Sequence, residues 1–164
     1  MRHDRLVFTA IICTTTACSP SADGWTVLDG VGVLGVSSGE AYVCGQGSAT
    51  ELSRWLSGGD VLEDDAGVWA LSVDRDGAFT LDGDGERWSG SLTPFVDGGL
   101  YAASPDGCRS GAVLFEGDLA GTWCNRAGTF RQVEPVDAVT GSPDTIEVRR
   151  VDLADDTFTL ERQP

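Results

Sequence analysis

The chain has 164 residues, of which 11 are basic and 26 acidic, giving a formal charge of −15, and 41% are hydrophobic. This composition is typical of a globular protein with one domain, and the negative charge argues against nucleic acid as a partner. The sequence contains no lysine, and its one histidine is His3, so beyond His3 a Ser-His-Asp triad, a histidine-ligated zinc and a Schiff-base lysine are excluded.

Residues 1–17 have the layout of a signal peptide. Arg2 and Arg5 precede an apolar run over 6–12, and small polar residues follow as far as Ala17. The apolar run is too short to span a bilayer, which needs about 20 residues. We expect 1–17 to be removed, 18–24 to form a tether and 25–164 to form a single all-β domain. The mature chain would then carry nine arginines and 25 acidic residues, a formal charge of −16.

The segment Thr15-Thr16-Ala17-Cys18 resembles the bacterial lipobox, with Thr15 in place of the usual Leu or Val. The resemblance implies cleavage between Ala17 and Cys18 and attachment of lipid to Cys18, which would anchor the protein to a membrane. Ser19 resembles the outer-membrane sorting pattern, so the implied location is extracytoplasmic, and the outer membrane if the host has two. An ordinary secretory signal and a retained N-terminal segment are the alternatives.

Downstream, period-two alternation between turn residues predicts short strands over 25–28, 31–36 and 41–44, with a weaker one over 51–56. A three-residue loop ending at Gly77 would then pair Val73 with Phe79 and Leu71 with Leu81. The Asp84-Gly85 pair, typical of a type I′ turn, would set Leu81 opposite Trp88 and Phe79 opposite Gly90.

Two further hairpins are predicted around Asp106-Gly107 and Gly117-Asp118. Their registers would align Tyr101, Ala112 and Trp123 across three strands. Residues 125–128 predict a turn into a strand over 129–133, and 135–143 a loop. The last hairpin would join 145–153 to 157–160 around 154–156. About ten short strands favour an antiparallel, barrel-like meander, with a β-sandwich as the alternative.

With Cys13 removed and lipid on Cys18, the cysteines Cys44, Cys108 and Cys124 remain. In an oxidising compartment, two of them are expected to form a disulfide. Their spacing favours Cys108 with Cys124, but the assigned register turns Cys124 away from Cys108 and places it opposite Gly111. A bridge from Cys44 to either partner is therefore the alternative. The third cysteine fits a small buried residue better than a nucleophile.

The acidic clusters 74–77 and 82–86 do not match the EF-hand ligand pattern, and Asp-Gly is common in hairpin turns, so we expect no metal site there. Paired carboxylates of a glycosidase are a weak indication in so acidic a chain. The aromatic residues Trp69, Trp88, Tyr101 and Trp123 fit core positions. Trp55 is the aromatic residue whose exposure would indicate a ligand site, although packing is the favoured interpretation.

The motifs Tyr42-Val43-Cys44-Gly45, Arg54-Trp55-Leu56-Ser57-Gly58 and Gly99-Leu100-Tyr101 resemble those of a loose group of uncharacterised exported proteins of high-GC bacteria. The resemblance covers about residues 31–125 and implies a small β domain behind a signal or lipid anchor.

Together these patterns predict a membrane-tethered module of the cell envelope that binds an envelope protein or has a structural role. We expect neither enzymatic activity nor a cofactor. A β-barrel carrier of a small hydrophobic ligand is the alternative, and a carboxylate-based hydrolase is the third hypothesis.

Overall fold

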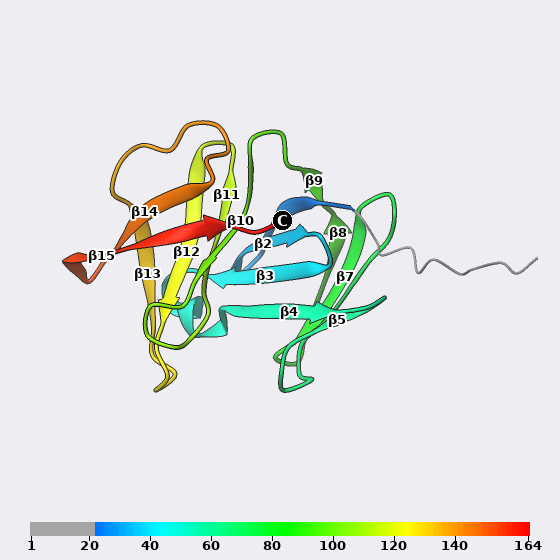
Figure 1. Cartoon of the computed structure of the whole chain (residues 1–164). Helices are drawn as coiled ribbons and strands as arrows, with labels where there is room; N and C mark the ends of the chain where they lie inside the picture. The colour runs from blue at the N-terminus through cyan, green and yellow to red at the C-terminus, as the bar shows by residue number, and fades with distance from the viewer. Residues whose placement is uncertain (1–21) are drawn as a thin grey trace, which may run out of the picture.

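The computed structural model describes residues 22–164, in which short antiparallel strands dominate (Figure 1). One 3-10 helix, η1 (Gly47–Leu52), lies between β3 and β4. The strands of the described residues are β1 (Gly24–Leu28), β2 (Gly32–Ser37), β3 (Glu40–Gly45), β4 (Arg54–Gly58), β5 (Leu62–Glu63), β6 (Ala70–Val73), β7 (Ala78–Gly83), β8 (Glu86–Ser91), β9 (Thr93–Pro94), β10 (Gly98–Ala103), β11 (Ser110–Phe115), β12 (Asp118–Cys124), β13 (Phe130–Pro135), β14 (Thr145–Arg150) and β15 (Leu153–Arg162).

Strands β1–β9 form a nearly closed sheet, the N-terminal sheet, in the order β8-β7-β6-β5-β4-β3-β2-β1-β9. Consecutive strands from β1 to β8 pair with one another, with η1 between β3 and β4, and β9 returns to pair with the start of β1. Asp84 and Gly85 both have positive φ, as a type I′ turn requires. The predicted pairs Val73–Phe79, Leu71–Leu81, Leu81–Trp88 and Phe79–Gly90 are all confirmed.

Strands β10–β15 form a closed six-stranded barrel, the C-terminal barrel. The barrel closes because β15 pairs with β10, with Tyr101 opposite Arg162 and Ala102 opposite Glu161. The all-β, antiparallel and barrel-like prediction is therefore confirmed. The predicted ten strands were too few, because the chain forms two such sheets, and β5 and β9 contain only two residues each.

The predicted turn at Gly117-Asp118 is wrong. The turn residues are Glu116 and Gly117, both with positive φ, so Phe115 pairs with Asp118. Ala112 consequently lies opposite Gly121 rather than Trp123, although its pairing with Tyr101 is confirmed. A shift of two residues keeps side chains on the same face of a strand, so Trp123 still packs into the barrel core with Tyr101 and Ala112.

Two predicted boundaries also differ from the structure. The first two residues of the strand predicted over 51–56 belong to η1, and β4 starts only at Arg54. The last hairpin turns at 151–152, where Arg150 pairs with Leu153. The predicted turn over 154–156 is instead an irregularity within β15, because the register shifts between Arg149 and Arg150. Such a bulge leaves strand residues without a partner opposite.

Three hydrophobic clusters hold the fold together. One fills the N-terminal sheet around Trp69, and another fills the C-terminal barrel around Tyr101. The third joins the two sheets, because Val33, Tyr42 and Cys44 of β2 and β3 pack with Leu100, Val113 and Ala120 of β10, β11 and β12. Gly111 permits this approach, since a Cβ there would lie 2.7 Å from the Tyr42 ring.

Candidate functional site

A cleft of about 380 Å³ lies where the N-terminal sheet meets the C-terminal barrel. Arg54 and Trp55 of β4 line it from one side. Cys108 and Arg109, from the loop between β10 and β11, line it from the other. The cleft combines charged, aromatic and disulfide-bonded side chains from both sheets, which makes it the candidate site.

Arg109 connects the two sheets at this cleft. Its guanidinium donates hydrogen bonds of 2.8 and 2.7 Å to the two carboxylate oxygens of Glu40, and one of 3.0 Å to Oε1 of Gln163. The guanidinium carbon lies 3.8 Å from the centroid of the Trp55 ring, and the Trp55 Nε1 donates to the Arg109 carbonyl at 3.1 Å. We call these four residues the Arg109 junction.

Two carboxyl groups at the cleft, those of Glu40 and Asp64, have lowered pKa values. The hydrogen bond from Arg109 lowers the pKa of Glu40 below its ordinary value. Burial works in the opposite direction at Asp64, but the N–H groups of Trp69 and Val68 and the charge of Arg54 outweigh it and lower its pKa. A general acid of a glycosidase needs a raised pKa, so this pair does not match that role.

Beneath the cleft, a buried polar cluster joins β3 to β12. The Thr122 hydroxyl lies 3.5 Å from the Cys44 Sγ and 2.9 Å from the Ser53 Oγ, which accepts a hydrogen bond from the Gly45 N–H. Burial raises the pKa of Cys44 to about 12 and that of Tyr42 above its usual range. Since the thiolate is the reactive form, Cys44 is unsuited to act as a nucleophile near neutral pH.

The described residues contain one disulfide, between Cys108 and Cys124, which is the pairing that spacing favoured. The predicted register argued against it, because it turned Cys124 away from Cys108, and that argument was wrong. The register of β10 and β11 was correct, but the strands stop at Ala103 and Ser110. Cys108 therefore lies in a six-residue loop rather than in a strand, so strand alternation does not fix its side chain, and it reaches Cys124.

The aromatic residues predicted for the core lie there. Trp69, Tyr101 and Trp123 are buried, and Trp88 is half-buried with its ring stacked on Trp69 at 5.6 Å. Trp55 is also half-buried, and its ring packs between Arg109 and Tyr42, 4.8 Å from the latter. This geometry agrees with a packing role for Trp55, on the wall of the cleft.

The acidic loops use their carboxylates to shape turns. Asp74 Oδ1 accepts hydrogen bonds from the N–H groups of Asp76 and Ala78, and Asp82 pairs with Arg87 across the next hairpin. Over residues 22–164, no three histidine, cysteine or acidic side chains are grouped so that they could hold a metal ion.

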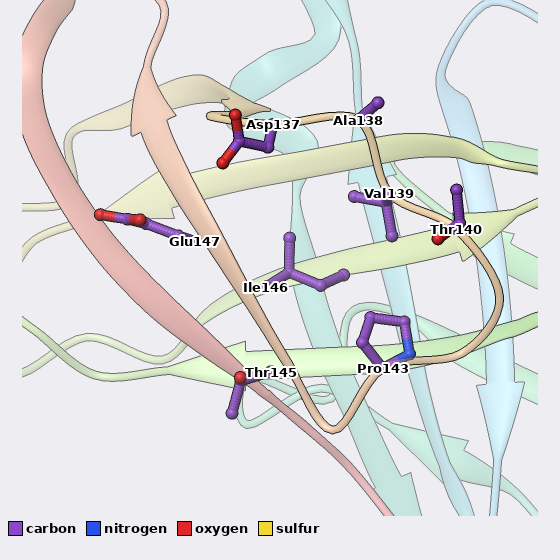
Figure 2. A pocket seen from close by; sticks show the side chains of 8 residues that line it. All are labelled: Asp137, Ala138, Val139, Thr140, Pro143, Thr145, Ile146 and Glu147. Carbon is purple, nitrogen blue, oxygen red and sulfur yellow. The ribbon is translucent and has the colours of Figure 1, made fainter.

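Side chains fill the interior of the C-terminal barrel, including Tyr101, Leu114, Trp123 and Leu160. A separate cavity of about 240 Å³ lies under the loop that follows β13 (Figure 2). Val139 of this loop points toward Ile146 of β14, while Glu147 points away from them. A carrier of a hydrophobic ligand requires a hollow barrel, so this packing does not favour it.

Sequence reasoning missed the Arg109 junction. Glu40 and Gln163 are 69 and 54 residues from Arg109, so no local pattern brings them together. The predicted cleavage and lipid-attachment residues, Ala17 and Cys18, lie outside the described residues. Within 22–164, none of the helical structure is both long and apolar enough to cross a bilayer.

No family model, curated protein or solved structure matches the chain.

Proposed function

We propose that the protein is an exported, lipid-anchored module of the cell envelope that acts through its surface rather than by catalysis. The observation that carries this proposal is the disulfide between Cys108 and Cys124. Structural disulfides persist in oxidising compartments outside the cytoplasm, which is the address that the lipobox-like segment before Cys18 implies.

The charge distribution supports a role at the envelope surface. Many arginines are engaged by neighbouring carboxylates, as in the pairs Arg54–Asp64, Arg109–Glu40 and Arg149–Glu134. Acidic side chains outnumber the arginines, so the surface carries a net negative charge. This charge keeps the protein soluble and repels nucleic acid. The two sheets pack against each other and the C-terminal barrel carries a disulfide, an arrangement that suits a binding or structural module.

The first test is the intact mass of protein extracted from its native membranes, after unfolding and alkylation under non-reducing conditions. We expect a chain that begins at Cys18, carries added acyl mass and has one alkylated thiol, on Cys44. Cys18→Ser should release the protein from the membrane fraction. Cys13→Ser is the matched control, because Cys13 belongs to the segment that is removed.

A chain that keeps Met1, lacks acyl mass or has every thiol alkylated would contradict the proposal. An unlipidated chain cut near Ala17, with the disulfide intact, would instead identify a secreted protein without an anchor.

A further inference from the structure

A small apolar patch lies on the molecule where the described chain begins. The Trp25 ring lies 4.5 Å from the Phe115 ring, centroid to centroid, and lines a cavity of about 260 Å³ together with Val96. Val27 is on the same face of β1 as Trp25, two residues further on. We call Trp25, Val27, Val96 and Phe115 the N-terminal patch.

The two valines of the patch are open to solvent, while its two aromatic rings also pack against the cluster that joins the sheets. Val96 is 92% exposed and Val27 is 65% exposed, whereas Trp25 and Phe115 are half-buried. Val96 belongs to the loop between β9 and β10, which rises beside β1 in Figure 1. An exposed apolar loop tip beside a tryptophan is typical of surfaces that bind another apolar phase or partner.

The position of the patch along the chain indicates what covers it. Trp25 is the seventh residue after Cys18, so at most about 25 Å of extended chain joins them. If lipid on Cys18 holds the chain at a bilayer, the N-terminal patch is confined to within that distance of the lipid surface. Such a tether makes contact with the bilayer an intramolecular event, so even weak contacts are populated.

We propose that the N-terminal patch is a lipid-docking surface, which seats the N-terminal sheet on the bilayer that holds the anchor. This inference rests on the proposed function for its anchor. Val96 would enter the headgroup region, and the Trp25 ring would lie at the interface, where tryptophan is favoured.

The charges that border the patch determine which lipid it prefers. Asp97 and Glu116 line the same cavity as Trp25 and Val96. Anionic headgroups would repel these carboxylates as well as the protein's net charge, so the docking surface favours zwitterionic lipid. Raising the salt concentration should reduce this discrimination.

The test uses the mature chain from Cys18, without natural lipid, coupled through Cys18 to a maleimide lipid in phosphatidylcholine vesicles. Cys44 is fully buried and Cys108 is joined to Cys124, so coupling is selective for Cys18 in the folded protein. Brominated lipids then quench tryptophans that reach the interface. We expect quenching in the wild-type chain, which Trp25→Phe removes and Val96→Asp strongly reduces.

Val68→Asp is the matched control, because Val68 is a 59% exposed valine in the loop between β5 and β6. It should leave quenching unchanged. Phosphatidylglycerol vesicles should give less quenching at low salt. Quenching equal in wild type, Trp25→Phe and Val96→Asp would overturn the proposal.

Sedimentation of the uncoupled chain tests the other occupants. If the wild-type chain forms a dimer and Val96→Asp dissociates it into monomers, the patch binds a second copy of the chain, and lipid docking is overturned. Because coupling is chemical, the vesicle result does not depend on natural lipidation. If the native protein carries acyl mass on Cys18 but the vesicle assay shows no quenching, only the docking is refuted. If the vesicle assay shows quenching but the native protein carries no acyl mass, the anchor is refuted.

Discussion

Replacing Arg109 with alanine should loosen the contact between the two sheets. Its side chain is 37% exposed and that of Glu40 is 33% exposed, so we discount their ion pair to about 0.5–1 kcal/mol. Stacking on Trp55 contributes about 1 kcal/mol and the hydrogen bond to Gln163 up to about 1 kcal/mol. These terms share one side chain and are not additive, so we expect a loss of about 2 kcal/mol.

Urea unfolding followed by tryptophan fluorescence measures this loss. With a slope of about 2 kcal/mol per molar urea, the midpoint of Arg109→Ala should fall by about 1 M. Arg87→Ala is the control, since Arg87 pairs with Asp82 inside one exposed hairpin and should cause a much smaller shift. If Arg109→Ala lowers the midpoint no more than Arg87→Ala, Arg109 does not join the sheets as argued.

The ion pair between Arg109 and Glu40 also predicts how the stability loss of Arg109→Ala depends on pH. Arg109 holds the pKa of Glu40 below its ordinary value of 4.5, so the pair's contribution is fully present above that pH. The contribution disappears as the pH falls through the folded-state pKa. The difference in unfolding free energy between wild type and Arg109→Ala should therefore be constant near neutrality and shrink in acid. A difference that stays constant down to pH 3 would contradict the role assigned to Glu40.

Three further outcomes are expected. Gly111→Ala should cost about 1–3 kcal/mol of stability in the same urea assay, because the new methyl group would clash with the rings of Tyr42 and Trp55. Gly59→Ala is the control and should leave the stability unchanged, because the space around Gly59 is open. The double variant Cys108→Ser/Cys124→Ser should lose about 3 kcal/mol for a 16-residue separation, and adding dithiothreitol should destabilise the wild type but not this variant. Cys44 should resist iodoacetamide at pH 8 in the folded protein and react in urea, as followed by mass spectrometry; rapid labelling without urea would mean that the cluster opens readily.

Local turn chemistry was sufficient to predict much of the register. Asp84-Gly85 has the residue types that tolerate positive φ at both turn positions, so the pairing on either side of it followed correctly. Glu116-Gly117 has the same geometry, but glutamate rarely adopts positive φ, and the sequence therefore favoured the neighbouring Gly117-Asp118. The prediction failed where the chain departs from the usual residue preference.

Closure into two sheets rather than one could not be predicted in this way. It depends on β9 returning to β1 and on β15 returning to β10, pairings between strands that are distant in sequence. Alternation along one strand is the same whichever distant strand it meets, so the sequence pattern predicts a barrel-like meander without indicating where it divides.

The Arg109 junction shows the same limit at the candidate site. A faint local signal exists, because Gly111 and Ala112 are small residues within a strand, which indicates that another part of the chain packs closely there. That signal does not identify Tyr42 and Trp55 as the groups that approach. Nor does it show that Arg109, next to the disulfide-bonded Cys108, reaches Glu40 and Trp55. Such a site follows only from the three-dimensional contact between the sheets, so its residues must be tested as pairs across that contact rather than one at a time.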